Sequence, residues 1–135
     1  DTNGVIFIAD RQNSRIRYIV NGIIDTYAGG GPSSNTADGF VGTNAYLTTS
    51  STDLKGDTMG NIYLVDSLRV KIVDYATKGV TTYISSGLST PRGLWLDFLN
   101  GRMVIGTARY VKTAPLSINP MAFPTTAPTT VLSQV

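Results

Sequence analysis

The sequence predicts an all-β chain, and three observations carry this prediction. The 135 residues include 18 Thr and 14 Gly, and every acidic residue is Asp. Thr favours strands, Gly and Asp favour turns, and Glu, the missing acidic residue, favours helices. The chain opens with "DTNGVIFIAD", and a near copy, "DTMGNIYLVD", occupies residues 57–66. Self-similarity at a period of tens of residues indicates a repeat architecture.

The first copy predicts a turn followed by three strands. Asp1 and Gly4 suit the first and fourth positions of a tight turn. The segment "VIFIAD" has the β-branched and aromatic side chains of a buried strand. The next segment, "RIRYIV", alternates basic and apolar residues, so one of its faces packs and the other meets solvent. Thr26 and Tyr27 belong to the third strand, which closes at "AGGG".

The second copy predicts one complete four-stranded unit. We expect its strands at roughly 52–56, 61–65, 69–74 and 80–84 because apolar alternation recurs there between turn residues. Residues 29–47, rich in Gly, are expected to link the first unit to the second.

The third copy, "LDFLNGRMVIGTARYVK", is degraded. Asp97 matches Asp57, one residue is inserted before Gly101, and Gly106 stands where the other copies end a strand in Asp. No match is found after Lys112. We therefore expect a Pro/Thr-rich tail or linker from there on.

At these motifs the chain resembles the NHL-repeat family of β-propellers. The segments "PRGLWLD", "GNIYLVD", "NSRIR" and "TYAGGG" follow the family pattern over roughly residues 1–108. The resemblance implies NHL-like β-propeller blades, one complete and two partial, in a segment spanning 1–112. An irregular tail would follow over 113–135. The second copy departs from the pattern, because it reads "SLRVK" and has Ser51 in place of Pro.

A closed propeller usually takes four to eight blades, more than these copies supply. Three interpretations remain open. The chain is part of a longer protein, as a first residue other than Met suggests, and further blades complete it. Alternatively, copies of the chain assemble with one another. In the third interpretation the propeller is open and its tail covers the exposed edge, with "TTVLSQV" as an edge-pairing strand.

Composition excludes several classes of function for these residues. The net charge is only +2, so we do not expect a nucleic-acid partner, and no apolar run approaches the roughly 18 residues of a membrane span. Neither Cys nor His occurs, which excludes His or Cys zinc ligands and His-dependent nucleophilic catalysis. We assign no catalytic residue, metal or cofactor. The His-bound metal of propeller-type amidating lyases therefore has no counterpart here.

Basic residues on related strands are candidates for a partner-binding surface: Arg11, Arg15, Arg17, Arg69 and Lys71. The alternative is that they belong to the repeat signature and pack or meet solvent in every blade. Repeated carboxylates have two interpretations as well: Asp10, Asp57, Asp66 and Asp97 either ring a channel and bind a cation or cap turns. Their recurrence with the repeat favours caps.

The tail contains "PTTAPTT", a pattern of extended and often O-glycosylated stalks. Candidate O-glycosylation sites are Thr125, Thr126, Thr129 and Thr130, and a plain linker is the alternative. We therefore expect a secreted, extracellular glycoprotein.

The expected function is a non-catalytic protein-binding or structural module that recognises a protein partner or copies of itself. Rim loops, including residues 29–47, would supply the binding surface. One alternative is a self-assembling fibre or sheath subunit that uses open propeller edges. Another is part of a larger propeller enzyme whose catalytic residues lie outside this chain.

Overall fold

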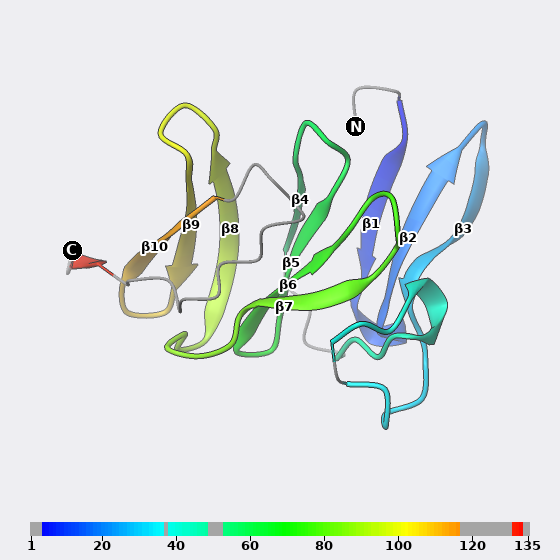
Figure 1. The fold of residues 1–135 in the computed structure, drawn as a ribbon, viewed down its shortest axis with the longest axis horizontal. Helices are drawn as coiled ribbons and strands as arrows, with labels where there is room; N and C mark the ends of the chain where they lie inside the picture. Colours follow the sequence, from blue (N-terminus) through cyan, green and yellow to red (C-terminus); the bar gives the residue numbers. More distant parts are fainter. Residues whose placement is uncertain (1–3, 37, 49–52, 117–130, 134–135) are drawn as a thin grey trace.

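The computed structural model describes residues 4–36, 38–48, 53–116 and 131–133, and it confirms the all-β prediction. Within these residues, eleven strands form three antiparallel sheets that lie side by side in chain order (Figure 1). The helices of this part are two single 3-10 turns, Arg11–Asn13 (η1) and Gly42–Asn44 (η2). None of the described helices is long and apolar enough to cross a membrane.

The first sheet is a three-stranded meander in the order β1-β2-β3. Its strands are β1 (Ile6–Asp10), β2 (Arg15–Val20) and β3 (Ile23–Gly29). The β2–β3 hairpin turns at Asn21 and Gly22, whose φ angles are 51° and 76°. Two positive φ values are typical of the type I′ turn, whose twist matches that of the flanking strands.

The second sheet has four strands in the order β4-β5-β6-β7. These are β4 (Leu54–Gly56), β5 (Ile62–Asp66), β6 (Arg69–Val73) and β7 (Val80–Ile84). The four-stranded unit predicted for the second copy is therefore confirmed, with boundaries that differ by at most two residues.

The third sheet also has four strands, although the sequence predicted a partial copy. The order is β8-β9-β10-β11, from β8 (Pro91–Asp97) and β9 (Arg102–Thr107) to β10 (Val111–Pro115) and β11 (Val131–Ser133). The expected boundary between residues 112 and 113 thus lies within β10. β11, from the end of the tail, pairs with β10.

Two apolar layers hold the sheets together, and the second sheet contributes to both. Successive side chains of a strand point to opposite faces of the sheet, and all five residues of β5 are buried because both faces are covered. Ile62 and Leu64 belong to the layer shared with the first sheet, whereas Tyr63 and Val65 belong to the layer shared with the third. The middle sheet is therefore covered on both faces.

The linker between the first and second sheets runs along the outer edge of β7. The Gly39 amide donates to the Val80 carbonyl at 3.0 Å, and the Val80 amide donates to the Phe40 carbonyl at 2.9 Å. The Asp38 carboxylate accepts from the Thr82 amide and hydroxyl, both at 2.8 Å. This stretch of the linker thus covers a sheet edge.

Candidate functional site

Strand pairing gives the three sheets a common register, and one polar position recurs in it. The equivalent basic residues of the middle strands are Arg17, Lys71 and Lys112. The equivalent residues at the ends of the preceding strands are Asp10, Asp66 and Thr107. We call the two residues of one sheet its polar pair: Asp10 and Arg17 in the first sheet, Asp66 and Lys71 in the second, and Thr107 and Lys112 in the third. Thr107, and not Gly106 as the sequence alignment predicted, takes the place of Asp in the third sheet.

The polar pair of the second sheet is buried and holds the linker before that sheet. Asp66 and Lys71 lie 3.4 Å apart, with side-chain exposures of 2% and 6%. One carboxylate oxygen of Asp66 accepts from the Thr48 amide at 2.8 Å and from its hydroxyl at 2.6 Å. The Lys71 ammonium donates to the Tyr46 carbonyl at 3.3 Å. Between them, Leu47 enters the apolar layer shared with the first sheet.

The third sheet repeats this arrangement with one change. The Lys112 ammonium donates to the Gly87 carbonyl, and Leu88 enters the apolar layer shared with the second sheet. Ser89 follows in the position of a hydroxyl residue. Thr107 supplies no carboxylate, and its hydroxyl donates to the Tyr110 carbonyl at 2.7 Å. No ion pair of Lys112 with a carboxylate occurs within the described part of the chain.

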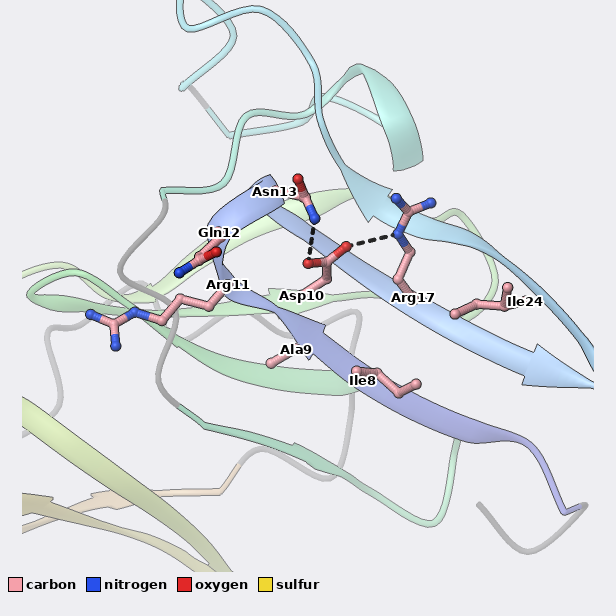
Figure 2. A pocket seen from close by; sticks show the side chains of 8 residues that line it. All are labelled: Ile8, Ala9, Asp10, Arg11, Gln12, Asn13, Arg17 and Ile24. Carbon is pink, nitrogen blue, oxygen red and sulfur yellow. Dashed lines mark hydrogen bonds and ion pairs between the residues drawn. The ribbon is translucent and has the colours of Figure 1, made fainter.

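In the first sheet the polar pair is only partly buried, and Figure 2 shows its hydrogen bonds. Arg17 Nε donates to Asp10 at 3.1 Å, and the Asn13 amide donates to the other carboxylate oxygen at 2.8 Å. The bond from Asn13, followed by that from Arg17, lowers the pKa of Asp10 below its ordinary value. A cavity of about 550 Å³ adjoins the pair and is also lined by Ile8 and Ile24.

Apolar side chains beside this pair are exposed. Ile6, Ile8 and Ile24 are 58%, 37% and 59% exposed. By register, their counterparts in the second sheet are at most 3% exposed: Ile62, Leu64 and Val80. We define the first-sheet face as these three isoleucines together with Asp10 and Arg17. It corresponds to surfaces that the other two sheets bury against a neighbouring sheet.

The five basic residues predicted as a partner-binding surface have different environments. Lys71 is buried inside the chain, as described above. Arg17 belongs to the first-sheet face, and Arg11 lines the adjacent cavity. Arg15 is half-buried on β2, and Arg69 is exposed at the start of β6. The structure therefore brings Arg11 and Arg17 together at one cavity and separates Lys71 from them.

Of the four repeated carboxylates expected to cap turns, Asp57 and Asp97 are engaged within their own turns, whereas Asp66 binds Lys71 and the linker. Asp57 accepts from the backbone amides of Met59 and Asn61, both at 2.9 Å. Asp97 accepts from the Asn100 amide group at 2.8 Å and, like Asp10, has its pKa lowered chiefly by an asparagine. No group of three or more potential metal ligands gathers among the residues that the structure describes.

A second cavity, of about 490 Å³, lies between the first and second sheets and is lined by aromatic rings. Lys78 Nζ lies 4.5 Å from the ring centroid of Tyr27 and 4.3 Å from that of Tyr75. The same ammonium donates to the Tyr27 hydroxyl at 3.1 Å. Burial raises the pKa of Tyr27 to about 12. Cation–π contacts thus join the two sheets at this point.

Sequence reasoning did not identify the isoleucines of the first-sheet face or Asn13 as site residues. The signal was present in the repeat, because Ile8 aligns with Leu64, but a strand pattern does not indicate whether a second sheet covers it. The four tail threonines predicted for O-glycosylation lie outside the described residues.

No model of a known protein family matches the chain, and no curated protein matches it in sequence.

Proposed function

We propose that the chain is a non-catalytic protein-binding or structural module built from propeller-type blades, and that its first-sheet face docks a β-sheet of another polypeptide. The observation that carries the proposal is the exposure of Ile6, Ile8 and Ile24 at positions that are buried in the second sheet. Burying an isoleucine side chain contributes about 1.5–3 kcal/mol relative to leaving it exposed. Three partly exposed isoleucines on one face of the first sheet, two on β1 and one on β3, therefore favour a partner.

The surfaces that cover the equivalent positions favour a second copy of this chain as that partner. Ile62 and Leu64 of the second sheet are covered by the first sheet, and Met103 and Ile105 of the third are covered by the second. A β-sheet of the same type is thus the surface to which these positions are complementary. A self-assembling structural subunit is the form of the proposed function that this observation favours. An extracellular location, suggested by the Thr/Pro-rich tail, is part of the same proposal.

Light scattering over a range of protein concentrations tests the proposal. We expect the wild-type mass to rise with concentration and the Ile8→Asp variant to remain a monomer, because the new carboxylate would lie on the same face as Asp10, and two carboxylates cannot be buried against the single charge of Arg17 without a large cost. Leu99→Asp is the matched control, since Leu99 is 94% exposed outside the face. A monomer mass for the wild type at every concentration would contradict the proposal, as would equal association of wild type and Ile8→Asp.

A further inference from the structure

We propose that the polar pair of the first sheet, Asp10 and Arg17, binds an extended polypeptide segment in which leucine is followed by threonine or serine. This inference rests on the proposed function and adds the chemistry of the segment that the first-sheet face recognises. It comes from comparing the polar pairs of the three sheets, two of which hold such a segment within the chain.

The second sheet shows both contacts of a polar pair, one to a carbonyl and one to a hydroxyl residue. Three consecutive linker residues take part: Tyr46 contributes a carbonyl, Leu47 an apolar side chain, and Thr48 its amide and its hydroxyl. Lys71 binds the carbonyl and Asp66 binds both donors of Thr48. The polar pair therefore binds a backbone carbonyl and a hydroxyl residue two positions later in the segment.

The third sheet shows which of these elements recur. Lys112 again binds a linker carbonyl, that of Gly87, and Leu88 is again buried, at 6% exposure. Ser89 keeps the hydroxyl residue, although Thr107 offers no carboxylate to it. The carbonyl contact and the leucine are thus common to both linkers, and the carboxylate adds the hydroxyl contact in the second sheet.

The first sheet carries the same groups with unused bonding capacity. The Arg17 guanidinium has five N–H donors; its Nε binds Asp10 and one terminal nitrogen binds the Thr26 hydroxyl. Its other N–H groups have no partner among the described residues and can donate to a carbonyl. Each carboxylate oxygen of Asp10 has two lone pairs, so the oxygen that accepts from Asn13 can also accept a hydroxyl or an amide.

The cavity beside the pair provides the place for the leucine. Ile8 and Ile24 line it together with the polar pair (Figure 2). Their counterparts, Leu64 and Val80, lie in the same apolar cluster as Leu47. The segment needs no charge of its own, because Asp10 and Arg17 already neutralise each other.

A peptide with the sequence of residues 44–48, acetyl-Asn-Ala-Tyr-Leu-Thr-amide, is the probe. It is titrated into the full ¹⁵N-labelled chain, and the NMR signals of the Asn13 side-chain amide and the Ile8 and Ile24 backbone amides are followed. We expect saturable shifts of these signals. Replacing the peptide's threonine with valine should weaken binding by about tenfold or more, since the hydroxyl's hydrogen bond to a charged group is lost while the backbone amide is kept.

Two variants of the chain localise the binding. Asp10→Asn should weaken it by about tenfold or more, because the ionised acceptor is removed. Asp25→Asn is the matched control: Asp25 is exposed on β3, accepts from the neighbouring Thr26 amide, and is not part of the face. Its affinity for the peptide should equal that of the wild type. The dispersion of the same spectra shows that both variants are folded.

The outcomes separate this inference from the proposed function. If the peptide does not shift the Asn13 signal while Ile8→Asp still abolishes association, the segment chemistry is wrong and the docking face stands. Equal binding of the threonine and valine peptides, or of wild type and Asp10→Asn, would also overturn the inference. If neither the peptide nor a second copy binds, both proposals fail.

Discussion

Replacing Asp66 with asparagine tests the most buried ion pair found among the described residues. The substitution keeps the size of the side chain and removes its charge, so Lys71 is left buried, at 5% exposure, without a counter-ion. Breaking a buried ion pair by removing one partner costs about 3–5 kcal/mol. Small domains have total stabilities of about 5–15 kcal/mol, so Asp66→Asn should remove a large part of the stability of this chain.

Asp10→Asn is the matched comparison because Asp10 occupies the same register position in the first sheet. Its polar pair is partly exposed to solvent, with side-chain exposures of 25% for Arg17 and 24% for Asp10. Exposed pairs are screened by water and contribute little. We therefore expect the stability of Asp10→Asn to stay close to that of the wild type at low protein concentration.

Urea unfolding followed by circular dichroism measures both changes as differences in the free energy of unfolding. The slope against urea should be the same for all three proteins, since neither substitution changes the surface exposed on unfolding. A loss below about 1 kcal/mol for Asp66→Asn would refute the reasoning, because that is the range of surface pairs. A loss for Asp10→Asn equal to that for Asp66→Asn would show that the first-sheet face is covered in solution.

Three further predictions concern single groups. Thr107→Asp should place a carboxylate beside Lys112, as in the second sheet, and increase the free energy of unfolding by about 1 kcal/mol. The urea midpoint should rise accordingly, and a lower midpoint would contradict the register assignment. Burial raises the pKa of Tyr27 from 10.0 to about 12. The contribution of the neutral Tyr27 to the free energy of unfolding is therefore fully present below pH 10 and is lost between pH 10 and about 12. Absorbance at 295 nm and circular dichroism should change together there, and titration of every tyrosine near pH 10 in the folded chain would contradict this. Asn13→Ala should raise the lowered pKa of Asp10 toward 3.8, measured by ¹³C NMR of the carboxyl; the contribution of this hydrogen bond is present above pH 3.8 and lost as the pH falls through the lowered value. An unchanged pKa would show that Arg17 alone sets it.

Local pattern was sufficient to predict the strands and turns of the second sheet. Period-two alternation, β-branched residues and Gly-containing turns are local properties, and they located four strands to within one or two residues. The register of the third sheet was assigned one residue too early. The residue inserted before Gly101 shifts all later positions of the third copy by one; the match of Gly106 to Asp left this shift out, whereas strand pairing gives the position to Thr107.

The extent of the third sheet depended on tertiary contacts as well. β10 continues to Pro115, and Leu116 is buried in the layer shared with the second sheet. A proline in sequence suggests the end of a strand, but it is tolerated where its missing N–H is not needed by a neighbouring strand. The first-sheet face could not be predicted either, because the apolar pattern of β1 is the same whether or not another sheet covers it.

The polar pairs and the apolar positions have different roles in sheet docking. Apolar contacts between sheets are not directional, so by themselves they permit neighbouring registers. A shift by one residue would turn every apolar side chain of a strand to the other face, and a buried Asp66 or Lys71 would then lose its linker partners. Since an unpaired buried charge is costly, the second sheet accepts its linker in one position only. The docking proposed for the first-sheet face follows the same argument: Ile6, Ile8 and Ile24 would supply the apolar contact, and Asp10 with Arg17 would determine which segment of the partner fits and in which register.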